Sequence, residues 1–128
     1  MLPDQAVYTA LMGSAGLQPY IAESGSPSDY RVFAEVAPQD TLFPLVVYRM
    51  VADQPFHSLS GSSNLRRALV QVDCYAATYV DAVTMGEAVF AVLSGNYTDF
   101  KGLAQDRRTM FDENSRVFSV SQDFAVWI

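Results

Sequence analysis

A thiol and an imidazole are the two side chains from which a nucleophilic site could be built, and the chain has one of each. Cys74 stands in a run of alternating apolar residues, where a free cysteine usually acts as a small hydrophobe. His57 has Phe56 and Ser58 as neighbours, with no carboxylate beside it to orient its ring. We therefore expect neither cysteine catalysis nor a histidine-based metal site, and a single cysteine excludes an internal disulfide.

Two glycine- and serine-rich stretches have the composition of phosphate-binding loops, namely Gly13-Ser14-Ala15-Gly16 and Leu59-Ser60-Gly61-Ser62-Ser63. Neither contains the lysine of a nucleotide-binding loop, and neither follows an expected strand and opens a long helix. Ser60 and Ser62 also lack the Gly-x-Ser-x-Gly frame of a hydrolase nucleophile. The sequence thus predicts no catalytic residue, no metal ligand and no cofactor, and we expect that the protein is not an enzyme.

Two basic doublets, Arg66-Arg67 and Arg107-Arg108, stand out in an acidic chain that has 8 basic and 14 acidic residues and a net charge of −6. Each doublet lies at the end of an expected strand, where exposure to solvent is the simplest interpretation. The alternative is that they pair with acidic groups on a neighbouring subunit. The acidic balance argues against a broad basic face for binding nucleic acid.

The elements that would position these residues are those of an α+β fold. The chain has 128 residues, half of them hydrophobic, which predicts a single domain over 1–128. Periodicity and turn residues predict helices at about 3–16, ended by Pro19, and 79–94, and strands at about 30–36, 43–51, 66–76, 107–111 and 116–128. This order favours a mainly antiparallel sheet of about four or five strands packed with two helices.

Three local patterns support these assignments. Thr78 and Asp81 form a capping box at the start of the second helix. Strict alternation places Ala68, Val70, Val72, Cys74 and Ala76 on an apolar side of the strand at 66–76, with Asp73 on its wet side. In the last strand only Gln122 interrupts an apolar alternation.

Residues 52–64 are predicted to form a polar loop that contains two apolar side chains, Phe56 and Leu59. These either fold back onto their own sheet or anchor the loop against a partner, in which case Arg66 and Arg67 pair with acidic groups across the contact. The candidate interface is therefore Phe56, Leu59, Arg66 and Arg67. Residues 23–29 are expected to form a turn. The uncharged stretch 5–22 holds too many Gly, Gln and Pro residues to span a membrane, and the N-terminus lacks the basic leader of a signal peptide.

The order of several blocks resembles the tail-completion family of long-tailed phages and prophages. The blocks are Ala-Pro-Gln-Asp-Thr-Leu-Phe-Pro-Leu-Val-Val-Tyr at 37–48, Leu-Ser-Gly at 59–61, Val-Gln-Val-Asp-Cys-Tyr-Ala-Ala-Thr-Tyr at 70–79, and Asp-Phe-Ala-Val-Trp at 123–127. The resemblance implies a structural tail terminator, or head-to-tail joining protein, that forms a ring of six subunits on the end of the tail tube. It also implies contacts with the tail tube protein and the head connector protein, in the virion tail and, during assembly, in the host cytoplasm.

The charge agrees with this role, because six copies would carry −36, six times the −6 of one chain, and acid lining a channel would disfavour adhesion of DNA that only passes through. No membrane partner is expected. Two alternatives stay open: a small-ligand-binding or enzymatic α+β domain with a pocket, and a minor capsid or tail-tube component.

Overall fold

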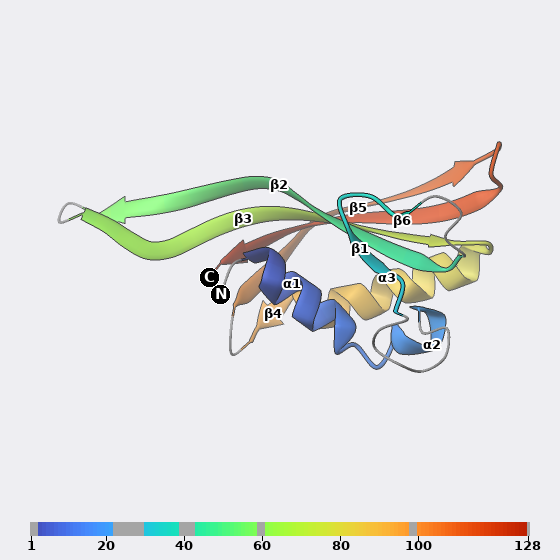
Figure 1. The fold of residues 1–128 in the computed structure, drawn as a ribbon, viewed down its shortest axis with the longest axis horizontal. Helices are drawn as coiled ribbons and strands as arrows, with labels where there is room; N and C mark the ends of the chain where they lie inside the picture. The colour runs from blue at the N-terminus through green and yellow to red at the C-terminus, as the bar shows by residue number, and fades with distance from the viewer. Residues whose placement is uncertain (1–2, 22–29, 39–42, 59–60, 98–99, 128) are drawn as a thin grey trace.

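A twisted sheet of six strands, in the order β1-β2-β3-β6-β5-β4, carries its helices on one face (Figure 1). The computed structural model describes residues 3–21, 30–38, 43–58, 61–97 and 100–127, and of residues 54–58 and 61–66 only the backbone. The elements are α1 (Pro3–Met12), α2 (Gln18–Ile21), β1 (Val32–Ala34), β2 (Leu45–Ser58), β3 (Gly61–Ala76), α3 (Tyr79–Leu93), β4 (Gly95–Asn96), β5 (Lys101–Asp112) and β6 (Val117–Trp127). The predicted turn at 23–29 lies outside the described residues.

The predicted α+β class and the mainly antiparallel sheet are confirmed, since β1 and β2 form the one parallel pair among the described strands. The sheet has six strands rather than four or five. The additional strand, β4, has two residues, which is too short to produce a periodic pattern in the sequence. Likewise there is a third helix, α2, of a single turn. None of the described helices has the length and the apolar character needed to cross a bilayer.

The first helix ends earlier than predicted. α1 stops at Met12, immediately before Gly13, and Pro19 lies inside α2 instead of ending α1. Pro19 is tolerated there because the first turn of a helix leaves its N–H groups without intrahelical partners. The connection between α1 and α2 lies close to α3, because a Cβ placed on Gly16 would lie 2.9 Å from the Cβ of Ala88.

The second helix agrees with its sequence signals. The hydroxyl of Thr78 accepts a hydrogen bond from the backbone N–H of Asp81 at 3.2 Å, which confirms the predicted cap. α3 packs across β3 and β6 and buries Ala82, Met85 and Val89. The alternating residues of β3 that were predicted to be apolar are buried together with this helix, namely Ala68, Val70, Val72, Cys74 and Ala76.

The opposite face of β3 differs from its prediction. Asp73 is only 4% exposed although alternation places it on the wet side. It is buried because side chains from β2, β3 and β6 gather around its carboxylate, as described below. Gln122, which interrupts the apolar alternation of β6, is also buried, and its amide bonds to α3.

The predicted loop at 52–64 is wrong in its secondary structure. β2 continues to Ser58 and β3 begins at Gly61, so the described residues of this stretch form two paired antiparallel strands of a hairpin. The outer strands stop earlier: β1 ends at Ala34, opposite Tyr48, and β6 ends at Trp127, opposite Arg67. The hairpin therefore extends beyond the rest of the sheet as a two-stranded ribbon, which Figure 1 shows reaching away from the helices. We call the outer part of this hairpin the arm: β2 from Val51 to Ser58, which has none of the described strands on its outer side, and β3 from Gly61 to Arg66, which lies beyond β6.

The composition of the arm explains why the sequence pattern does not predict its strands. Pro, Ser, Gly and Gln are typical of loops, and they give no apolar alternation. An outer strand tolerates a proline such as Pro55, because the missing N–H matters only on a paired edge. Two register shifts, between Met50 and Ala52 and between Pro55 and His57, further interrupt the pattern.

Candidate assembly surfaces

The arm contains two of the four predicted interface residues, Phe56 and Arg66, and Arg67 lies at its base. Phe56 belongs to β2 and Arg66 to β3, whereas Leu59 and the side chains of Phe56 and Arg66 lie outside the described part of the chain. Arg67 pairs through its backbone with Gln54 and Trp127. Its guanidinium lies over the indole ring of Trp127, 5.6 Å from the ring centroid. The base of the arm is thus held by a contact within the chain.

The second basic doublet is also engaged within the chain. Arg107 forms an ion pair with Glu87 on α3. Arg108 pairs with Asp106 and, at 3.1 Å, with Asp123 on β6. Hydrogen bonds to Asp123 and Asp106 raise the pKa of Arg108. Both arginines thus have partners within the chain, and the doublet lies within β5 rather than at a strand end. Pairing with a neighbouring subunit stays a prediction.

A polar network occupies the face of the sheet that the helices leave open. The buried carboxylate of Asp73 accepts hydrogen bonds from the hydroxyl of Ser121 and from the amide of Gln71, at 3.0 Å for the latter. Arg49 on β2 approaches the same carboxylate at 3.4 Å through Nη2. Burial, with a further contribution from Asp73, raises the pKa of Tyr75. The network joins three strands, β2, β3 and β6.

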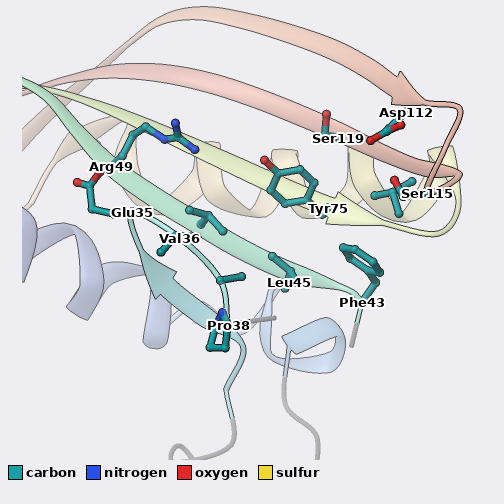
Figure 2. A pocket seen from close by; sticks show the side chains of 13 residues that line it. Glu35, Val36, Pro38, Phe43, Leu45, Arg49, Tyr75, Asp112, Ser115 and Ser119 are labelled. Carbon is teal, nitrogen blue, oxygen red and sulfur yellow. The ribbon is translucent and has the colours of Figure 1, made fainter. Parts of the chain in front are cut away.

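A groove of 470 Å³ lies beside this network, between the segment after β1 and the open face (Figure 2). Figure 2 shows Arg49 and Tyr75 on β2 and β3, and Ser119 and Asp112 on the β5–β6 hairpin. Val36 and Phe43 form an apolar rim. The groove thus offers both charged and apolar groups, the mixture that protein–protein contacts use. Nothing in the sequence indicated it, because its lining comes from four separate segments.

Cys74, the thiol considered for catalysis, lies on the opposite face from the groove. It is fully buried among the helices, and burial raises its pKa from 9.0 to about 12, so the thiol is neutral at physiological pH. The backbone of His57 lies in β2, in the arm, and its side chain is outside the described part. Within the described residues, no three His, Cys, Asp or Glu side chains gather where a metal ion could bind.

β5 has an unusual exposure for a strand of twelve residues. Every residue from Gln105 to Asp112 is exposed, including Met110 at 62% and Phe111 at 42%. Phe111 packs against Phe118 with ring centroids 4.6 Å apart and ring planes tilted by 42°, and Tyr79 meets the Phe118 ring edge-on at 6.0 Å. This end of the sheet therefore presents aromatic surface beside an edge strand, a combination that favours contact with another chain.

Comparison with known proteins gives a family and a fold. The family model described as tail completion protein gp17 matches residues 5–128. A chain from the virion of a native gene transfer agent particle is similar in structure, with a TM-score of 0.66 over 98% of this chain and 92% of that chain, at 16% sequence identity. At this identity the likeness is one of fold. No curated protein matches the chain.

Proposed function

Because the chain belongs to the tail completion protein gp17 family, we propose that it completes a phage tail by assembling as a ring on the end of the tail tube. The family resemblance found in the sequence is confirmed, and the chain is a structural tail-completion protein. The ring, its six copies and its particular partners are the further content of the proposal. The similar chain belongs to a virion particle, which supports a place in the virion for this one.

The observation that carries the proposal is the arm. A two-stranded hairpin is marginally stable in water when it stands alone, because it has no third strand and no helix to cover it. Here the arm extends beyond β1 and β6, the two strands that flank it nearer the helices. We propose that assembly supplies the missing neighbour, so that the arm contacts an adjacent subunit or the tube.

The proposed contact residues on and beside the arm are Phe56, Leu59, Arg66 and Arg67. The apolar pair would supply most of the binding energy, as anchors at the centre of an interface generally do. The partners are further copies of the chain, the tail tube protein on one side and the head connector protein on the other, with DNA only as passing cargo. Assembly takes place in the host cytoplasm, and the finished ring belongs to the virion tail.

The experiment compares tube capping by two double variants. Phe56→Ser with Leu59→Ser removes the apolar anchors of the arm. Phe90→Ser with Val80→Ser, at α3 residues 44% and 70% exposed outside the arm, is the matched control. We expect both variants to fold as judged by circular dichroism, and only the arm variant to lose capping of purified tail tubes. An arm variant that folds and caps normally contradicts the proposed contact, and one that unfolds assigns Phe56 and Leu59 to the core.

A further inference from the structure

The outer edge of β5 is long and unprotected. β4 pairs with it only at Lys101 and Gly102, and from Leu103 to Asp112 none of the described strands lies on its outer side. Folded proteins usually protect such edges with short strands, prolines or charges, because an open edge pairs with other chains. β5 is long and contains no proline, although a bulge interrupts it at Gln105.

The register identifies the backbone groups that face outward. The carbonyl of Phe100 accepts a hydrogen bond from the N–H of Tyr97, on the β4 side. Alternate residues of a strand direct their N–H and C=O to the same side, and the shift between Ala104 and Asp106 moves this alternation by one residue. The backbone groups of Arg107, Thr109 and Phe111 therefore point away from β6.

The charged side chains of β5 do not prevent another strand from pairing with this edge. Arg107 is directed to Glu87 on α3, and Arg108 to Asp106 and Asp123. Because these charges are compensated within the chain, a strand that approaches the edge meets little repulsion. The exposed side chains of Met110 and Phe111 add apolar area on the two faces of the same stretch.

A strand suited to this edge is present in the arm of the same chain. β1 pairs with β2 only from Val46 to Tyr48. Just beyond, the carboxylate of Glu35 accepts the N–H of Met50 at 3.3 Å and so ends the contact on that side. From Val51 onward, β2 is the outer strand of the arm. The sheet thus has one long open strand near each of its ends.

The strand directions make these two edges compatible. The pairs β2–β3, β3–β6 and β6–β5 are all antiparallel, so β5 runs opposite to β2. Rotation about an axis along the strands preserves strand direction, and it places β5 of one copy antiparallel to β2 of the next. The same contact then repeats around the ring until it closes, which is the head-to-tail type of interface.

We infer that the outer edge of β5, Leu103–Asp112, binds the β2 strand of the arm, Val51–Ser58, from the adjacent copy of this chain. The inference rests on the proposed ring and names the surfaces that join its subunits. Pro55 removes one donor from the arm strand, so the contact depends on the remaining backbone groups and on the apolar side chains beside them.

Two variants each disrupt one side of this contact, the first the β5 edge and the second the arm. Thr109→Pro removes an outward N–H while the hydrogen bonds to β6 remain, and Thr109→Ala keeps that N–H as the matched control. An arm-deleted variant joins Gln54 to Arg67, which pair across the hairpin, through an Asn-Gly turn. By sedimentation velocity, at concentrations where the wild type associates, we expect Thr109→Pro and the arm deletion to weaken association at least about a hundredfold and Thr109→Ala to leave it unchanged. Thermal melting verifies that each variant is folded.

A mixture of the two defective variants gives the sharper result. Thr109→Pro keeps a functional arm and the arm-deleted variant keeps a functional β5 edge, so together they form a one-to-one dimer and nothing larger. A mixture that remains monomeric, or a Thr109→Pro variant that assembles like the wild type, overturns the inference while leaving the proposed ring intact. A wild type that forms no ring even on tail tubes overturns the ring itself.

Hydrogen exchange on the wild type tests the same contact without a substitution. On assembly, the amides of Arg107, Thr109 and Phe111 should exchange at least about ten times more slowly, because each gains a hydrogen-bond acceptor. If these amides exchange equally fast in the ring and in the free chain, the edge is not the contact.

Discussion

Gln122 on β6 donates a hydrogen bond from Nε2 to the carbonyl oxygen of Gly86 on α3, with 2.8 Å between the two atoms. The contact marks a point of close approach between the helix and the sheet, since a Cβ on Gly86 would lie 2.9 Å from Cγ1 of Val120. It also explains the polar interruption in the apolar alternation of β6. The glycine and the glutamine are two parts of one packing arrangement.

Gly86→Ala should therefore destabilise the fold. Alanine favours a helix over glycine by about 1 kcal/mol, but overpacking this contact costs about 1–3 kcal/mol, so we expect a net loss. Gly13→Ala is the control, because its Cβ would meet no atom closer than 3.4 Å. Urea unfolding measures both. Equal or higher stability of Gly86→Ala would show that α3 has room to shift.

Asp73 should matter more to stability than its ion-pair partner. Asp73→Ala leaves the hydroxyl of Ser121 and the amide of Gln71 without their acceptor, and we expect a loss of about 2–3 kcal/mol. Arg49→Ala should cost less than about 1 kcal/mol, because the Arg49 side chain is 40% exposed and Asp73 keeps its other donors. Chemical denaturation of the two variants decides the order, and the reverse order contradicts this account of the network.

Cys74 is expected to be a packing residue. Cys74→Ala should lower the free energy of unfolding by about 1 kcal/mol through lost packing, with tail assembly retained. The native thiol should react with a thiol reagent only at the rate at which the fold opens. Rapid labelling of the folded protein, or loss of assembly at unchanged stability, would reveal a role beyond packing.

Stability should fall at alkaline pH. Burial raises the pKa of Cys74 from 9.0 to about 12, so above pH 9 the unfolded chain loses this proton while the folded chain keeps it. The unfolded state then binds fewer protons, and the free energy of unfolding decreases by up to about 1.4 kcal/mol per pH unit. Burial also raises the pKa of Tyr48 and Tyr75, which adds to the decrease at higher pH. Between pH 9 and 12, Cys74→Ala should show a shallower decrease than the wild type.

Elements set by neighbouring residues could be predicted from the sequence, whereas contacts between residues far apart in the sequence could not. Thr78 and Asp81 define the start of α3 within four residues, and alternation along β3 identifies the buried side that contains Cys74. The environment of Asp73 depends on Arg49 and Ser121, which lie 24 and 48 residues away in sequence. No local pattern brings such residues together, and alternation alone therefore placed Asp73 in solvent.

The strands of the arm could not be predicted from the sequence for a different reason. Its strands pair with each other beyond the hydrophobic core, so their register depends on backbone pairing and leaves no apolar alternation to read. The sequence nevertheless drew attention to this region through Phe56 and Leu59. The predicted loop is a hairpin in the structure, and the interface at Phe56 and Leu59 stays a prediction.

Cryo-electron microscopy of tail tubes incubated with the purified protein tests the central claim most directly. We expect a closed ring at one end of the tube, with a β-sheet that runs without interruption from β5 of each subunit into the arm of the next. Tube ends that stay bare in the presence of saturating folded protein would contradict the proposed tail-completion ring.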